Sequence, residues 1–322
     1  MKAIVQVGYG SPDVLELREV EMPRVEANGV LVRVHAASVN ALDWHTTRGM
    51  PYFIRALEGL RSPRQPIRGV DLAGRVEAVG KDVTGFRPGD EVFGGTNGSF
   101  AEFTATTPDR LALKPAGLTH GEAASLHVAG LTALQGLRDK ARVRPGQRVL
   151  VHGAGGGVGT FAVQIARWLG AHVTAVTRTE SVELVRSIGA DEVIDHRRED
   201  FTRRGERYDV FFDIGGNRPL ADCRRVLTEK GVLVAVGAPP GRWLAPATRL
   251  LQVAALSPFV SQRLVPFVSK NDAPGLVLLK ELAEAGKVRP VIDRRYPLAE
   301  AAEAIRYVGE GHARGKVVVE IG

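Results

Sequence analysis

The strongest chemical signal in the sequence is a group of closely spaced glycines in HGAGGGVG, residues 152–159. They follow the apolar run RVLV and lead into GTFAVQIARWLG, which has the periodicity of an amphipathic helix. Helix N-termini present unpaired N–H groups and the positive end of the helix dipole, so they attract phosphate. Glycines let the backbone turn tightly and approach a pyrophosphate without a Cβ in the way.

The spacing of these glycines matches a dinucleotide-binding fingerprint. It reads Ala154-x-Gly156-x-x-Gly159, with alanine at the first glycine position and with Gly157 and Val158 inside the loop. A short motif is weak evidence alone, but this one lies between a predicted strand and a predicted helix, with further strand–helix units after it. We therefore predict a dinucleotide site, and a purely structural glycine-rich turn is the alternative.

The residues after the next predicted strand, in TAVTRTES, indicate which dinucleotide binds. Sites that prefer NAD usually carry an acidic residue about 20 residues beyond the glycines, where it accepts hydrogen bonds from the ribose 2′-OH. This chain has Thr177, Arg178 and Ser181 there. Hydroxyls and a guanidinium bind a 2′-phosphate that an acid would repel. NADPH is the predicted cofactor, unless Arg178 simply points to solvent.

Three regions of the chain differ in their periodicity. Residues 1–118 contain short β-type runs broken by turn formers, which predicts a β-rich, barrel-like domain. The middle alternates apolar strands with helices, as a parallel sheet covered on both faces requires. This is a doubly wound nucleotide-binding layout. From about residue 288 strand character returns, so the last strands are expected to rejoin the first domain.

Composition excludes several classes of protein. The 322 residues are 44% hydrophobic and 25% charged, a globular balance that suggests about two domains. The net charge of +7 is dispersed and interleaved with acids, so we expect no nucleic-acid partner. A start without the apolar core of a signal peptide, and the lack of a spanning apolar run, lead us to expect a cytoplasmic protein with no membrane partner.

Cys223 is the only cysteine, which excludes an internal disulfide and thiolate zinc clusters. It lies in PLADCRRVL, a predicted helix, where a half-buried small hydrophobe is the expected role rather than a reactive thiol.

Longer motifs resemble the medium-chain dehydrogenase/reductase superfamily along essentially the whole chain. They are AASVNALDWHTTRG, GVDLAGRVEAVGKDVTGFRPGDEVFG, AGLTALQGL, AGGGVGTFAVQIARWLGA and GKVVVEI. Within the superfamily they resemble the zinc-independent quinone oxidoreductase branch, which includes enoyl-reductase-like members. The resemblance implies an α/β fold class, with a GroES-like β-rich catalytic domain (1–122 and 289–322) plus a Rossmann doubly wound parallel-sheet domain (123–288). It also implies a cleft between the domains and a homodimer paired through the cofactor domains.

The resemblance further implies that no catalytic metal is bound. Zinc-dependent relatives place their ligands at positions that hold Asn40, Val70 and Val128 in this chain, and the four-cysteine structural lobe is missing. His127 and Asp71 stand near the lost ligand positions, but two groups do not make a tetrahedral site.

Catalytic candidates follow from the charge that a reduction creates. Hydride delivery to a quinone or enone places negative charge on an oxygen, which needs a donor. Asn40 occupies the cleft-facing position of the family motif and is the candidate for orienting nicotinamide or substrate; an asparagine that ends a strand in a local turn is an equal alternative. The family's tyrosine position holds His45 or Pro51 here, with Tyr52 adjacent. His45 and Tyr52 are therefore weaker candidates for the acid, and solvent is the alternative proton donor.

Further cofactor contacts are implied by the resemblance alone. Thr132 corresponds to a threonine beside the nicotinamide, Gly237 to a close-approach position after a late Rossmann strand, and Lys316 to a terminal lysine that reaches the cofactor phosphates. His196 stands where relatives often have a tyrosine near the adenine. A helix residue, a turn former and a solvent charge are the respective alternatives for the first three.

Two apolar segments, residues 49–69 and 239–267, are expected to line the substrate cleft with Phe53, Trp243, Leu250 and Phe259. The second segment could equally be a dimer contact or a core helix. We expect an NADPH-dependent, zinc-independent reductase that acts on a small apolar quinone or α,β-unsaturated carbonyl. An NADPH-dependent ketone or aldehyde reductase, and a non-catalytic NADPH-binding sensor, are the alternatives.

Overall fold

The structure, a computed structural model, describes residues 1–237 and 245–322. Trp243 and the side chain of Leu250, both expected in a cleft wall, lie outside the described residues. The chain divides into two compact units: unit 1 comprises Met1–Leu131 and Asn271–Gly322, and unit 2 comprises Thr132–Lys270. No helix in the described part of the chain is long and apolar enough to cross a membrane.

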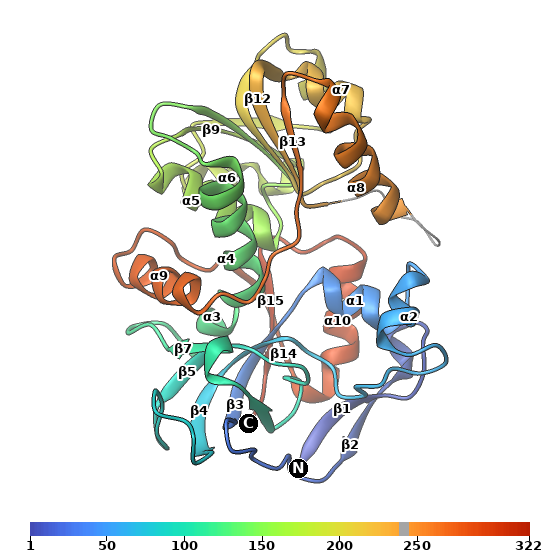
Figure 1. Ribbon diagram of the computed structural model, residues 1–322, viewed down its shortest axis with the longest axis vertical. Coiled ribbons are helices and arrows are strands. Elements are labelled where there is room, and N and C mark those ends of the chain that lie inside the picture. Colours follow the sequence, from blue (N-terminus) through green and yellow to red (C-terminus); the bar gives the residue numbers. More distant parts are fainter. Residues whose placement is uncertain (238–244) are drawn as a thin grey trace. The chain divides into compact units, whose positions relative to one another are not determined.

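Unit 1 is built on a seven-stranded sheet with the order β14-β15-β3-β4-β5-β7, in which β6 also pairs with β3 (Figure 1). Its strands are β3 (Val30–Val39), β4 (Asp71–Val79), β5 (Glu91–Gly95), β6 (Phe103–Thr106), β7 (Leu111–Leu113), β14 (Ile292–Pro297) and β15 (Lys316–Glu320). A separate pair, β1 (Lys2–Gln6) and β2 (Leu15–Glu19), is antiparallel. The β-rich first domain expected from the sequence is confirmed.

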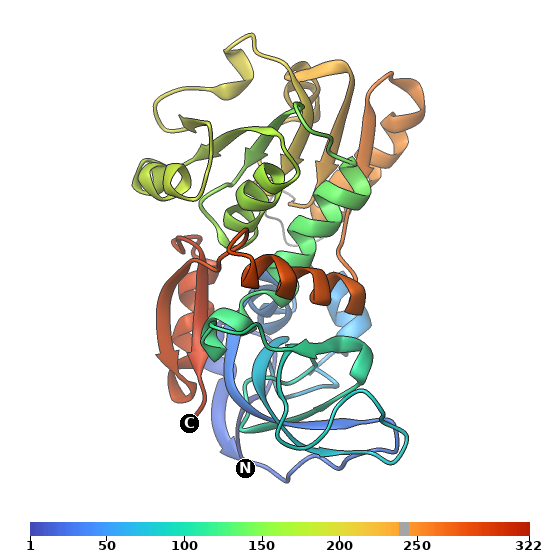
Figure 2. The same cartoon turned by 90° about the vertical axis from the view of Figure 1, so that its left-hand side faces the viewer.

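The C-terminal strands complete this sheet. β15 pairs antiparallel with β3, and Figure 2 shows these last strands, in red, beside the blue N-terminal part of the chain. The pairing is favoured because β3 is apolar along most of its length, with Arg33 its only exposed residue. Val32 and Val34 of β3 pack with Val317 and Val319 of β15 in one buried core. The helices of unit 1 are α1 (Ala41–Arg48), α2 (Phe53–Glu58), α3 (His120–Ala124), α9 (Ala273–Glu284) and α10 (Ala301–Gly309).

Unit 2 is a six-stranded, wholly parallel sheet with the order β10-β9-β8-β11-β12-β13. The strands are β8 (Arg148–His152), β9 (His172–Thr177), β10 (Glu192–Asp195), β11 (Tyr208–Asp213), β12 (Leu227–Ala235) and β13 (Arg263–Pro266). Figure 1 shows α5 (Gly157–Trp168) and α6 (Val182–Ser187) on one side of the sheet, and α7 (Leu220–Arg225) and α8 (Ala245–Leu256) on the other. This confirms the Rossmann doubly wound parallel-sheet arrangement, in which the strand order reverses between β8 and β11.

The boundaries of the units differ from the expected 122/123 and 289. The first falls inside α4 (His127–Leu134), which continues into a π-helical segment, Gln135–Ala141. The second falls before α9, which belongs to unit 1 because its Leu279 packs against Gly130 and its Glu284 accepts a hydrogen bond from the Ala116 N–H at 2.9 Å. Helical periodicity alone suggests instead that this segment continues the Rossmann pattern.

Candidate functional site

The glycine loop follows the carboxyl end of β8, at the point in the sheet where the strand order reverses. Gly153 has a φ of +86°, a left-handed conformation that favours glycine. The loop then folds back, since the N–H groups of Gly153 and Ala154 both donate to the Val176 carbonyl at 3.1 Å. Gly156 is the N-cap of α5, so the first N–H groups of this 12-residue helix face the loop.

The glycines of the loop have different steric roles. A Cβ at Gly159 would overlap the carbonyl oxygen of Gly153 and lie 2.6 Å from Ala154 Cα, so this glycine permits close packing of helix and loop. A Cβ at Gly156 would meet only Gly153 O, at 3.6 Å. The Gly156 side of the loop is therefore open to a ligand.

Two hydroxyls, one from the last residue of β9 and one from the 3₁₀ turn that follows it, flank the same loop. A Cβ at Gly155 would lie 2.6 Å from Thr177 Oγ1 and 2.8 Å from Ser181 Oγ. Ser181 is buried, and its hydroxyl has no hydrogen-bond partner among residues 1–237 and 245–322. A buried hydroxyl without a partner, beside a loop with an open glycine, fits a ligand that carries phosphate or ribose oxygens.

Arg178 lies between these two residues in the chain, is half-buried, and is the N-cap of a short 3₁₀ turn. The nearby acids are engaged with other groups. Glu180 pairs with Arg197 at 2.5 Å, and Asp195 accepts from the Thr179 hydroxyl at 2.6 Å. That Thr179 hydrogen bond, helped by the backbone of Arg197, holds the pKa of Asp195 below its usual value.

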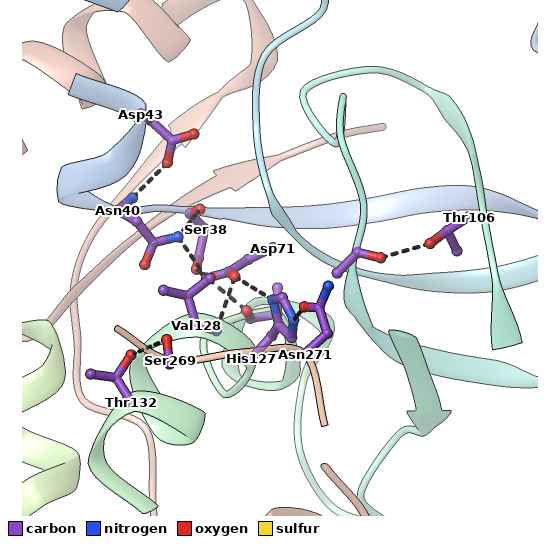
Figure 3. A network of polar contacts seen from close by, with 12 residues as sticks. Ser38, Asn40, Asp43, Asp71, Thr106, His127, Val128, Thr132, Ser269 and Asn271 are labelled. Carbon is purple, nitrogen blue, oxygen red and sulfur yellow. Dashed lines mark hydrogen bonds and ion pairs between the residues drawn. The ribbon is translucent and has the colours of Figure 1, made fainter. Parts of the chain in front are cut away.

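His196 and Gly237 form backbone hydrogen bonds at the carboxyl ends of the strands of the same sheet. The His196 N–H donates to the Thr177 carbonyl at 3.0 Å, and burial lowers the pKa of its imidazole. The Gly237 N–H donates to the Asp213 carbonyl at 3.0 Å, and a Cβ there would overlap Ile214 O. Its close approach is therefore to the protein backbone. Thr132 stands at the start of unit 2, where its hydroxyl donates to Ser269 Oγ at 2.9 Å (Figure 3).

Sequence reasoning missed a buried histidine–aspartate pair at the point where the strand order reverses. His152 ends β8 and Asp213 ends β11, and His152 Nδ1 donates to Asp213 Oδ1 at 2.8 Å. The same oxygen accepts from the Gly216 N–H at 2.9 Å. The signal was present, because each polar residue follows an apolar strand run directly, in RVLVH and VFFD.

In unit 1 the polar candidates gather around the carboxylate of Asp71, at the start of β4 (Figure 3). It is fully buried and accepts five hydrogen bonds. Oδ1 accepts from His127 Nδ1 at 2.9 Å and the Val128 N–H at 3.1 Å. Oδ2 accepts from Ser38 Oγ at 2.5 Å, Asn40 Nδ2 at 2.9 Å and Lys316 Nζ at 3.3 Å. We call these residues, Ser38, Asn40, Asp71, His127 and Lys316, the Asp71 network.

The network favours a charged Asp71. Burial by itself raises the pKa of this carboxyl, but the Lys316 ammonium and the donors from His127 and Ser38 outweigh burial and hold the pKa well below its usual range. Lys316 is 2% exposed and donates to Asn40 Oδ1 at 2.7 Å. Asn40 and Lys316 are thus brought together inside unit 1, although the resemblance gave them different roles.

Asp43 lies beside the network, on α1. It is buried, and its Oδ2 accepts the Asn40 N–H at 2.8 Å. Burial raises its pKa to about 7, and the negative charge of Asp71 contributes in the same direction. The folded protein therefore keeps this proton at pH values where the unfolded chain has lost it.

We expect Asp43→Asn to change the pH dependence of stability. Because the pKa is raised in the folded state, the stability associated with this group is highest below the ordinary pKa of 3.8 and falls as the pH rises toward about 7. Asparagine keeps an acceptor for the Asn40 N–H without the charge. As the pH rises from 5 to 8, the free energy of unfolding of the wild type should therefore fall by on the order of 2 kcal/mol more than that of the variant. Urea unfolding of both proteins across this range measures the difference. An equal fall in both proteins over this range would contradict the assignment.

His45 and Tyr52 lie in the segment after Asn40 and make contacts within that segment. His45 is exposed on α1, and its Nδ1 donates to the Met50 carbonyl at 3.2 Å. Tyr52 precedes α2, with the Arg55 guanidinium 5.0 Å from its ring centre; the same guanidinium lies 4.8 Å from the Tyr9 ring. This stacking fixes the segment, where Phe53 is 40% and Leu60 77% exposed.

Across the described ranges, no group of three His, Cys, Asp or Glu side chains is placed to hold a metal ion. Val128 contacts the Asp71 carboxylate through its backbone N–H. Asn40 uses its side chain to bind Lys316 and Asp71. Cys223, the single cysteine, is buried.

Comparison with known proteins agrees with this geometry. Residues 26–116 match the alcohol dehydrogenase GroES-like domain, and residues 188–319 match the zinc-binding dehydrogenase domain. A chloroplast envelope quinone oxidoreductase homolog of Arabidopsis thaliana is 33% identical, over 99% of this chain and 98% of its own. An NADPH-dependent alkenal/one oxidoreductase from the same plant is 34% identical, over 99% of this chain and 79% of its own. The solved quinone oxidoreductase of Coxiella burnetii has a TM-score of 0.88 and 31% identity, covering 100% of this chain and 99% of its own.

Two domains, a doubly wound parallel sheet and an open glycine loop define a nucleotide-dependent oxidoreductase fold. The chain belongs to the medium-chain dehydrogenase/reductase superfamily, in its zinc-independent quinone oxidoreductase branch.

Proposed function

We propose that the protein is an NADPH-dependent, zinc-independent oxidoreductase that acts on a quinone or an α,β-unsaturated carbonyl. The observation that carries the proposal is the open Gly156 side of the loop, flanked by the hydroxyls of Thr177 and Ser181, while Arg178 directly follows Thr177 in the chain and the acids near the end of β9 are engaged by other groups. The names of the relatives, which include quinone and NADPH-dependent alkenal/one oxidoreductases, support the same chemistry.

When bound, NADPH supplies the hydride, and the protein supplies position and polarity. The loop from Ala154 to Gly159 and the first N–H groups of α5 would hold the pyrophosphate. Thr177, Arg178 and Ser181 would hold the 2′-phosphate and ribose. His196, Gly237 and Thr132 are proposed as further contacts to the dinucleotide.

On unit 1, Asn40 is proposed to orient nicotinamide or substrate, with His45, Tyr52 or solvent supplying the proton. One hydrogen of the Asn40 amide is bound by Asp71, whereas the other makes a long contact, 3.4 Å, to Ser38 O. The second hydrogen can therefore stabilise negative charge on an oxygen. Exposed Phe53 and Leu60 favour a small apolar substrate near this segment.

The deciding experiment measures NADPH oxidation by metal-free protein against quinones, enones and simple ketones, with NADH in parallel. Rapid turnover of a quinone or enone with NADPH supports the proposal. Turnover confined to ketones or aldehydes would favour a carbonyl reductase. Tight NADPH binding without turnover on any acceptor would favour a sensor.

Arg178→Asp tests the assignment of the 2′-phosphate. We expect NADPH affinity to fall at least tenfold while NADH affinity changes less than about threefold, because a charge-assisted hydrogen bond to the extra phosphate is replaced by repulsion. Fluorescence titration of both cofactors measures this, with Arg18→Asp, on the surface of β2, as the matched control. Equal losses for both cofactors would contradict the assignment.

We also propose a cytoplasmic homodimer paired through unit 2. β13 is the last strand of its sheet, an edge to which a second copy can pair, and Phe259 and Leu251 nearby in the sequence are 85% and 67% exposed. Phe259→Glu is expected to yield monomers in light scattering, whereas Leu60→Glu, at the 77% exposed position in unit 1, should not. A wild-type monomer would overturn the dimer.

A further inference from the structure

The buried ammonium of Lys316 finds its hydrogen-bond partners inside unit 1, in the Asp71 network. Lys316 is the first residue of β15 and is 2% exposed. Its ammonium donates to Asn40 Oδ1 at 2.7 Å and to Asp71 Oδ2 at 3.3 Å. A buried ammonium needs a counter-charge and hydrogen-bond acceptors, and both are supplied here from β4 and from the end of β3.

The amide of Asn40 is fixed at both ends by these contacts. Its oxygen faces a cation, Lys316, and its nitrogen faces an anion, Asp71. Turning the amide over would point NH₂ at the ammonium and oxygen at the carboxylate, which loses both hydrogen bonds and opposes like charges. The two charges therefore select one of the two amide orientations.

We propose that Lys316 is a positioning residue for Asn40 rather than a ligand of the cofactor phosphates. This inference rests on the proposed role of Asn40. Lys316 and Asp71 together keep the second Asn40 amide hydrogen directed away from both charges, on the side where it makes the long contact to the Ser38 carbonyl. A residue of β15 thereby fixes the amide orientation of Asn40, which lies 276 positions earlier in the chain.

The first test uses wild-type protein and needs no turnover. Reductive methylation followed by mass spectrometry reports which lysines are accessible. Lys316 should stay unmodified both with and without NADPH, whereas Lys287, which is exposed, should be modified in both. Modification of Lys316 without NADPH and protection with it would overturn the proposal in favour of a phosphate contact.

The second test uses Lys316→Met, which keeps the length of the side chain and removes the charge. NADPH affinity should change less than about twofold, while kcat falls at least tenfold because the amide is no longer held in one orientation. Labelling with ¹⁵N-asparagine gives few side-chain amide signals, since the chain has only Asn28, Asn40, Asn97, Asn217 and Asn271. The Asn40 signal should move and its protons should exchange faster.

A tenfold loss of NADPH affinity, or an unchanged Asn40 signal with unchanged kcat, would overturn the proposal. If Lys316→Met does not fold, the double variant Asp71→Asn/Lys316→Met removes both buried charges and permits the same spectrum. If the proposed function is wrong, the wild-type protein will not turn over any acceptor. The methylation pattern of Lys316 and the Asn40 amide signal can still be measured in that case, so the two failures are distinguishable.

Discussion

Asp71→Ala is expected to lower the free energy of unfolding by about 3–5 kcal/mol, because it removes one partner of a buried ion pair. The Lys316 ammonium, 2% exposed, would be left without its counter-charge. The donors of Ser38, His127 and Val128 would also lose their acceptor, and each unmatched buried group adds to the loss. Urea unfolding at pH 7 measures the difference.

The matched control is Asp13→Ala. Asp13 likewise pairs with a basic side chain, that of Arg306, at 2.6 Å, but the Asp13 side chain is 75% exposed. A pair on the surface is screened by water and contributes little to stability, so the control should change little.

The double variant Asp71→Asn/Lys316→Met should recover part of the loss, since it removes both charges together. A loss of less than about 1 kcal/mol for Asp71→Ala would mean that the network is open to water and that Lys316 finds another partner. The proposed positioning of Asn40 would then lose its physical basis.

Much of the fold follows from periodicity in the sequence. Apolar strand runs alternating with helices predict the parallel sheet of unit 2, and turn-broken alternating runs predict the β-rich unit 1. The position of α9 was harder to predict. Its helical pattern is compatible with either unit, and only its packing against Gly130 and its bond to Ala116 decide the matter.

The candidate site likewise has one part that the sequence predicts and another part that it does not. The glycine loop and the hydroxyls after β9 are close in sequence, so motif spacing predicts their association. The Asp71 network joins residues from separate segments of the chain, and no local pattern could show that Lys316 reaches Asn40. A resemblance carries over a residue's identity but not its hydrogen-bond partners, which depend on the strand pairing of β15 with β3.

The His152–Asp213 pair shows what a positional rule can add. Both residues end parallel strands at the point where the strand order reverses, where ligands of such sheets bind. Polar residues that directly follow apolar strand runs at this point can therefore be marked as site candidates from sequence alone.

Two alanine substitutions in the glycine loop should separate stability from cofactor binding: Gly159→Ala should lower the stability, and Gly156→Ala should lower the affinity for NADPH. A methyl group at Gly159 overlaps backbone atoms of the loop, so Gly159→Ala should cost about 2–3 kcal/mol of unfolding free energy. A methyl group at Gly156 meets only Gly153 O at 3.6 Å, and the φ of −88° suits alanine. Gly156→Ala should therefore change stability by less than about 1 kcal/mol.

The same Gly156→Ala variant should bind NADPH about 10- to 100-fold more weakly, because the methyl group occupies the space through which a pyrophosphate would approach the N–H groups of α5. Fluorescence titration and urea unfolding on both variants separate the two effects. Gly85→Ala is the control, since a Cβ there meets nothing within 4 Å. If Gly156→Ala binds NADPH as wild type does, the open side of the loop is not the pyrophosphate site, and the dinucleotide must be held from the β9 side by Thr177, Arg178 and Ser181 instead.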